Sequence, residues 1–122
     1  MLLVVEPLRH HEDPRGELLK AHPGPVQGEV YALVARPGAR RGDHWHDTMG
    51  EWFVAVSGRG VLHAEHPGSG ERQTVDLAGV RVYVPAGVAH VLIGSGPEDL
   101  VVVAMAERLH DPDDVHPHRV AT

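Results

Sequence analysis

The stretch RRGDHWHDTMGEWFVAVSGRG at residues 40–60 contains two histidines one residue apart, a glutamate five residues further on, and several glycines. In an extended strand, side chains alternate between faces, so His44 and His46 point to one side and Trp45 to the other. The next apolar run begins at Glu51, and a charged carboxylate inside a barrel is costly unless it is paired or binds metal. The stretch therefore predicts that both histidines and Glu51 share one metal ion.

A His-x-His pair alone is weak evidence for a metal site in this chain. The sequence has 11 histidines in 122 residues, and at that density about one such pair is expected by chance. A second pair, His116 and His118, lies in a tail that contains prolines. The surroundings of His44 and His46, rather than the pair itself, must decide the interpretation.

A fourth ligand is expected from GVRVYVPAGVAHVLIG at residues 79–94. Valines alternate there with Arg81 and Tyr83, the PAG triplet turns the chain, and His90 opens the next strand. These two runs predict a second hairpin that faces the first across a small barrel. His90 would then point toward the same ion.

The whole chain is typical of one all-β domain spanning residues 1–122. Its 14 glycines and 10 prolines separate short runs rich in Val, Leu and Ala, and regularly spaced turn residues indicate a sandwich or barrel. Candidate strands cover residues 2–5, 17–21, 29–36, 51–57, 61–66, 73–77, 80–84, 90–93 and 100–106. We expect a polar tail at about residues 108–122, which drapes over the barrel or frays in solvent and carries His110, His116 and His118.

Composition excludes several classes of function. The chain has no cysteine, so it forms no disulfide and no thiolate metal site. A net charge of −6 gives no basic footprint for nucleic acid. No apolar run approaches the ~18 residues of a membrane span, and the first residues resemble a strand rather than a signal peptide. We expect a soluble cytoplasmic protein.

The spacing of the two histidine runs resembles the two signature motifs of the cupin superfamily. The first runs from Gly38 through His44, His46 and Glu51 to Gly58, and the second from Gly79 through Pro85 and Gly87 to His90. One position departs: the second motif usually ends in Asn, where this chain has Gly94. The resemblance implies a double-stranded β-helix, or jelly roll. It also implies that a divalent metal is held by His44, His46, Glu51 and His90. Three imidazoles and a carboxylate do not distinguish between Zn, Fe, Mn, Ni, Co and Cu.

Three stretches carry a narrower resemblance: DPRGELLK at 13–20, GDHWHDTMGEWFVAVSGRGV at 42–61 and AERLHDPDDVHP at 106–117. They look like the cupin domain that ends the bifunctional capsular-polysaccharide enzymes making UDP-N-acetyl-L-fucosamine. The Asp-x-Arg-Gly at residues 13–16 is also similar to the nucleotide 4-keto-sugar epimerases and ketoisomerases. No reductase domain accompanies the cupin within these 122 residues. The resemblance implies an epimerase or isomerase acting on a carbohydrate-like substrate.

Such a reaction needs a base beside the metal. A ketone acidifies the neighbouring C–H, a bound ion acts as Lewis acid on the oxygen, and a positioned base contributes typically ~10²–10⁴-fold. His63 and Tyr83 are the candidate catalytic residues on strands expected to line or rim the cavity, although a solvent-facing His63 and a packed Tyr83 are the alternatives. Arg15 and Arg81 carry forked donors suited to a diphosphate, but we expect surface ion pairs for both.

Two other functions stay open on the sequence: a cupin dioxygenase that uses a redox metal, and a non-catalytic metal- or sugar-binding module. The quaternary structure is expected to be a homodimer. Trp52, Val54 and Val56 fall on the face opposite Glu51, and the run 100–106 is apolar on both faces. A chain of this size has too few elements to cover both surfaces, so a second copy is expected to do so.

Overall fold

The computed structural model describes residues 1–122, whose regular secondary structure is β-strand apart from one short 3₁₀ turn. The elements are β1 Val4–Pro7, β2 Arg9–Asp13, β3 Gly16–Lys20, β4 Val30–Ala35, β5 Arg40–Trp45, β6 Glu51–Ser57, β7 Gly60–Glu65, β8 Arg72–Asp76, β9 Val80–Val84, β10 Ala89–Gly94, β11 Leu100–Ala106, the 3₁₀ turn η1 Pro112–Asp114, and β12 His116–Pro117. No helix is long and apolar enough to cross a membrane.

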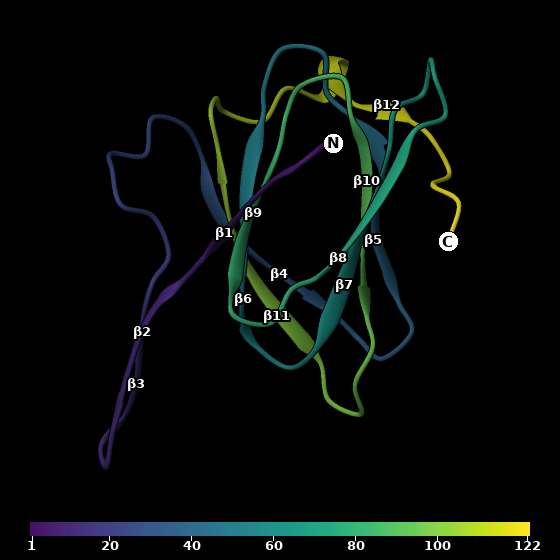
Figure 1. Ribbon diagram of the computed structural model, residues 1–122. Helices are drawn as coiled ribbons and strands as arrows, with labels where there is room; N and C mark the ends of the chain where they lie inside the picture. Colours follow the sequence, from purple (N-terminus) through teal and green to yellow (C-terminus); the bar gives the residue numbers. More distant parts are fainter.

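Two antiparallel five-stranded sheets face each other, in the orders β1-β9-β6-β11-β4 and β12-β5-β10-β7-β8. This is the double-stranded β-helix expected from the sequence, and Figure 1 shows the two sheets enclosing a common interior. The strands β2 and β3 pair only with each other, and this hairpin projects away from the barrel (Figure 1). The all-β prediction is confirmed.

The core lies between the two sheets and follows the alternation of the strands. Fourteen buried apolar residues form one cluster, to which Phe53, Leu62, Val82 and Leu92 contribute side chains that are at most 1% exposed. Because alternate residues point inward, each of these strands sends its apolar set to the interior. The ring of Phe53 lies 5.4 Å from that of His90, so the core borders the predicted metal site directly.

A close approach of β5 and β10 places two of the predicted ligands opposite each other. His90 pairs with His44, and a register shift follows before Val91 pairs with Gly42. Gly42 has a φ of 121°, and a Cβ there would lie 2.7 Å from the carbonyl oxygen of His90. Only glycine tolerates both the backbone conformation and the contact. This irregularity sets how far His44 and His90 are from each other.

Of the two alternatives expected for the tail, the structure shows the one in which it lies over the barrel rather than fraying in solvent. Val120 is only 1% exposed, and it packs against Ala89 and Val91 on the outer face of β10. β12 pairs with β5 and extends that sheet by one strand. Prolines and aspartates made the segment look disordered, but one buried valine and several long-range hydrogen bonds hold it in place.

Candidate metal centre

Three imidazoles converge inside the barrel at the end of β5 and the start of β10. Ring centres are 4.8 Å apart for His44 and His46, 5.1 Å for His44 and His90, and 6.0 Å for His46 and His90. One nitrogen from each ring lies within 4.8 Å of the others, close enough for a shared ion. Alternation along β5 supplies the first two, and the pairing of β5 with β10 supplies the third.

Glu51 completes the cluster from the opposite sheet. Its side chain is 3% exposed, and Oε1 lies 3.1 Å from Nε2 of His46. Oε2 accepts a 2.5 Å hydrogen bond from the hydroxyl of Tyr31. Burial alone would raise the pKa of Glu51, but the hydrogen bonds from His46 and Tyr31 outweigh it and lower the pKa. The structure therefore brings together all four residues predicted as ligands, with the carboxylate as an anion.

The three histidines differ in their electrostatics. Burial, and then the neighbouring His44, lowers the pKa of His90 to about 4. Burial followed by the charge of His46 lowers the pKa of His44. Burial would also lower the pKa of His46, but hydrogen bonds to Glu51 and to the carbonyl of Asp114 raise it instead. The lowered pKa values favour the neutral, metal-binding form of His44 and His90.

The donor set fits a divalent transition metal. Nδ1 of His46 is 2.8 Å from the carbonyl oxygen of Asp114, and Nδ1 of His90 is 3.2 Å from that of Val88. Ligating histidines usually donate their second nitrogen to such an acceptor, which fixes the ring and directs the other nitrogen to the metal. For His46 and His90, Nε2 is the nitrogen left for coordination. Three imidazoles and one carboxylate suit Zn, Fe, Mn, Ni, Co and Cu alike.

Two cavities border this cluster. A cavity of about 360 Å³ is lined by His44, His46 and Glu51 together with Met49, Ala106 and Val115. A second cavity of about 410 Å³ also borders His44 and is lined by Phe53, Arg41 and His90 among others. The volumes fall within the range of roughly 300–1,000 Å³ typical of small-molecule sites.

Two polar residues that the sequence analysis did not propose for the site, Glu29 and Tyr31, also line the first cavity, together with His110 of the tail. Tyr31 lines the second cavity as well. Burial and the adjacent Glu51 raise the pKa of Tyr31 far above its usual range, so its hydroxyl stays protonated. Tyr31 lies two and four residues before the buried Leu33 and Ala35, so all three share one face of the strand. This spacing is the sequence signal that Tyr31 faces inward.

The structure places neither His63 nor Tyr83 in the cavity. His63 lies between Leu62 and Ala64, which are at most 1% exposed and point inward, so its ring lies on the outer face with Nδ1 3.0 Å from the hydroxyl of Thr74. The expectation that His63 lines the cavity is wrong, because the strand period of two sends it to the other side.

Tyr83 follows the same rule. It lies between the buried Val82 and Val84, its ring is 5.2 Å from that of Trp52, and its hydroxyl donates to Glu107 at 2.9 Å. The expectation that Tyr83 lines or rims the cavity is therefore also wrong, and the structure shows the alternative, a packed aromatic with a paired hydroxyl.

The two candidate phosphate-binding arginines form ion pairs. The guanidinium of Arg15 lies 2.7 Å from the carboxylate of Asp13, and that of Arg81 pairs with Glu6. Arg81 also covers the ring of Trp52, with its guanidinium carbon 5.0 Å from the ring centre. The expectation of ion pairs is confirmed for both.

Comparison with known families identifies the domain. A family model described as the polysaccharide biosynthesis C-terminal domain matches residues 11–117. The chain belongs to this family. The match supports the resemblance to the cupin domains of capsular-polysaccharide enzymes, and it covers both histidine motifs.

Individual relatives are longer than this chain. The sequence is 25% identical over 107 residues to a UDP-2-acetamido-2,6-beta-L-arabino-hexul-4-ose reductase of Pseudomonas aeruginosa, which covers 85% of the chain and 29% of the reductase. The capsular polysaccharide assembling protein CapF of Staphylococcus aureus superposes with a TM-score of 0.72 at 30% identity, over 93% of this chain and 35% of CapF. The chain thus spans about a third of the length of these relatives.

A nucleotide-sugar epimerase shares the fold. ChmJ, a 3′-monoepimerase from Streptomyces bikiniensis solved in complex with dTDP-quinovose, superposes with a TM-score of 0.85 at 21% identity. The superposition covers 95% of this chain and 69% of ChmJ. It confirms the jelly-roll architecture.

Proposed function

We propose that this chain is a metal-binding cupin domain that epimerises or isomerises a keto sugar, with a 4-keto nucleotide sugar as the first substrate to test. The observation that carries the proposal is the convergence of His44, His46, His90 and Glu51 beside a cavity into which Tyr31 also points. The family and the sugar-modifying relatives support the substrate class.

The reaction moves a proton beside a carbonyl group. A divalent ion held by the three histidines and Glu51 would supply Lewis acidity toward the carbonyl oxygen. Tyr31 keeps its proton and donates it to Oε2 of Glu51, so its hydroxyl oxygen is placed to accept a hydrogen bond from a substrate hydroxyl. Among the other cavity-lining side chains, Glu29 and His110 are the groups able to accept a proton, and they replace His63 and Tyr83 as the candidate bases.

Glu29 and His110 lie close together at the cavity. The backbone N–H of His110 donates to Oε1 of Glu29 at 3.2 Å, which ties the tail to the start of β4. A base there would remove the proton on the carbon next to the carbonyl, and a proton would return to the other face of that carbon. The site thus offers a proton acceptor, a proton-bearing hydroxyl and a cation site around one space.

Solvent exchange tests the proposal directly. The protein is incubated in D₂O with UDP- or dTDP-4-keto-6-deoxy sugars, and the ring protons are followed by NMR. We expect deuterium at C3 or C5, lost in His44→Ala and slowed by about 10²–10⁴-fold in the variant that removes the base, His110→Ala or Glu29→Gln. Tyr31→Phe should slow exchange as well.

His63→Ala is the matched control, because its ring lies on the outer face of the barrel. It should exchange as fast as wild type. Absence of exchange above the buffer rate with several sugars and metals would contradict the proposal and favour a dioxygenase or a binding module. A redox-inert resident ion such as zinc would then argue against the dioxygenase.

We also propose a homodimer, on a patch that differs from the expected one. Val54 is fully buried and Arg81 covers Trp52, so neither supplies a free apolar surface. The exposed apolar side chains of this sheet lie on both edge strands and on β6. Val30 and Val34 of β4 are 56% and 46% exposed, Val4 and Val5 of β1 are 46% and 37% exposed, and Val56 is 38% exposed. An exposed apolar edge strand is a ready surface for pairing with a second copy.

A further inference from the structure

We propose that residues 111–122 act as a clamp that brackets the metal-binding stretch and orients His46, with Asp114 as the positioning residue. The inference deepens the proposed metal site and rests on that proposal. The docked segment contacts the chain at two places, immediately before His44 and immediately after His46.

The first anchor is Asp114, whose side chain and backbone hold three consecutive residues of one loop. Its carboxylate accepts hydrogen bonds from the backbone N–H of Asp47 at 2.7 Å, and from the N–H and hydroxyl of Thr48 at 3.1 and 2.6 Å. Its carbonyl oxygen lies 2.8 Å from Nδ1 of His46. With Nδ1 engaged outward, Nε2 of His46 points to Glu51 and the cavity. Asp114 is itself 8% exposed, so these bonds are shielded from water.

The middle of the clamp extends the sheet that carries the ligands. In β12, His116 pairs with Trp45 and Pro117 pairs with His44. The rings of His116 and Trp45 stack 4.2 Å apart at 26°. Trp45 lies between the two ligand histidines and points to the outer face, so the stacking holds β5 from the side opposite the metal.

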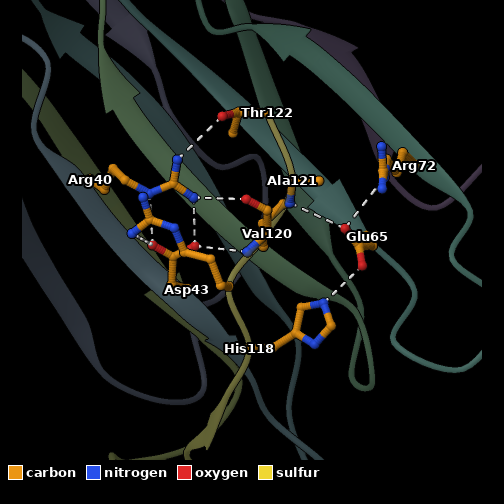
Figure 2. Close-up of polar contacts among 9 residues, drawn as sticks. Arg40, Asp43, Glu65, Arg72, His118, Val120, Ala121 and Thr122 are labelled. Atoms are coloured by element: carbon orange, nitrogen blue, oxygen red, sulfur yellow. Dashed lines mark hydrogen bonds and ion pairs between the residues drawn. The ribbon is translucent and has the colours of Figure 1, made fainter.

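The second anchor lies at the other end of the segment and is shown in Figure 2. The N–H of Val120 donates to Oδ1 of Asp43 at 3.0 Å, and Arg40 bridges Asp43 at 2.8 Å to the carbonyl oxygen of Val120 at 2.9 Å. Nearby, Glu65 accepts from the N–H of Ala121 at 3.2 Å and lies 2.9 Å from Nε2 of His118 (Figure 2).

Asp43 connects this anchor to the metal site. It directly precedes His44, and its φ of 58° is left-handed, which is unfavourable for a residue other than glycine. Its bonds to Arg40 and to the backbone of Val120 hold it in that conformation. The clamp therefore fixes the backbone on both sides of the two β5 ligands, at Asp43 and at Asp47.

The test compares Asp114→Ala with Asp113→Ala in the full chain. Asp113 is exposed and lies on the same turn, so its loss removes the same charge without touching the loop. We expect Asp114→Ala to weaken Co²⁺ binding about 10–100-fold, the cost typical of losing a residue that orients a ligand, and to alter the visible absorption of the bound ion. Asp113→Ala should match wild type. Asp114→Asn keeps one acceptor oxygen and should rescue part of the affinity.

A second measurement does not depend on metal. In the metal-free protein at pH 9, ¹⁵N NMR of His46 should show the Nδ1–H tautomer in wild type. Asp114→Ala keeps the carbonyl group but loses the carboxylate contacts that hold it beside His46, so it should show a mixture of tautomers. Val120→Asp, which releases the second anchor, should shift both readouts in the same direction.

The outcomes separate the clamp from the function proposed above. A variant that unfolds more easily but keeps wild-type Co²⁺ affinity, absorption and tautomer would overturn the inference, since the segment would then add stability alone. Failure of wild type to bind Co²⁺ would contradict the proposed metal site, and the tautomer measurement would still decide whether Asp114 orients His46.

Discussion

His46 differs from the other two histidines of its site, although all three rings lie around one point. It is the one whose pKa is raised, because Glu51 and the carbonyl of Asp114 both favour its protonated form. His44 and His90 have lowered pKa values, chiefly because they are buried. An ion that binds here displaces a proton from His46, so uptake of metal should release acid and weaken as the pH falls.

The first prediction concerns the ligands. Wild type should carry about one divalent ion per chain, measured by elemental analysis after purification. Loss of a residue that only supports a ligand costs about 10–100-fold in metal affinity, and His46→Ala should cost more because it removes a ligand itself. Glu51→Gln should also weaken binding, because it removes the anionic donor. His63→Ala, on the outer face, should retain the ion. Full occupancy in His46→Ala would show that His46 is not a ligand.

The second prediction follows from His90 in the metal-free protein. Its pKa is about 4 in the folded state, against about 6.5 in an unfolded chain. Between these pH values the unfolded chain binds a proton that the folded protein excludes, so stability falls as the pH falls through this window, by roughly 3 kcal/mol at most. Urea unfolding at pH 7, 6, 5 and 4.5 measures the slope.

Two variants isolate the contribution of His90. His90→Gln should flatten the pH slope because it removes the titrating ring. Leu92→Ala, on the same strand and 1% exposed, should lower stability by about 2–5 kcal/mol at every pH without changing the slope. Equal slopes in wild type and His90→Gln would show that another group controls the acid sensitivity.

At the scale of elements, Gly58 and Gly79 of the two histidine motifs meet different structural requirements. Gly58 and Gly79 both have left-handed backbones, with φ of 75° and 70°. A Cβ on Gly58 would lie 2.1 Å from the carbonyl oxygen of Asp99, whereas one on Gly79 would meet nothing within 4 Å. The first glycine thus permits close contact between two turns, and the second serves only the conformation of its own turn.

The third prediction uses these glycines as a matched pair. Gly79→Ala should cost about 1–2 kcal/mol of unfolding free energy, the penalty for a left-handed residue with a Cβ. Gly58→Ala should cost clearly more, because backbone atoms must also move. Urea denaturation of both variants gives the comparison, and equal losses would mean that the contact with Asp99 relaxes without cost.

At the scale of the whole molecule, the proposed homodimer depends on the apolar surface that the barrel leaves exposed to solvent. The inner faces of both sheets are filled by the core, and residues 111–122 cover part of the outer face of β5 and β10. The outer face of the other sheet keeps exposed valines, most of all on the edge strand β4. Pairing of two such faces would remove them from water.

The fourth prediction is that wild type is a dimer at micromolar concentration, with twice the 13.2 kDa mass of the chain by light scattering. Val34→Asp should shift the mass to that of the monomer, because it places a charge in the patch. Leu109→Asp is the control: Leu109 is 73% exposed but lies outside both sheets, so the dimer should persist. A monomeric wild type would contradict the assembly.

The fold class and the four candidate metal-site residues could be predicted from the sequence because strand alternation and turn residues are local signals. Alternation in β5 places His44 and His46 on one face, and Gly and Pro mark where strands turn. The same alternation also held the information that Tyr83 opposes Val82 and Val84, and that His63 opposes Leu62 and Ala64. The chemical type of a side chain therefore does not show that it lines the cavity; the position of the apolar face of its strand does.

Tertiary structure alone decided the surroundings of the metal site. Asp114 lies 68 residues from His46 in sequence, and Tyr31 lies 20 residues from Glu51, so no local period connects either pair. The docking of residues 111–122 depends on a hydrophobic patch around Val91 and on Asp43, Arg40 and Glu65, which come from two different strands. Local propensity describes such a segment as a solvated tail, and only the packed barrel offers the partners that order it.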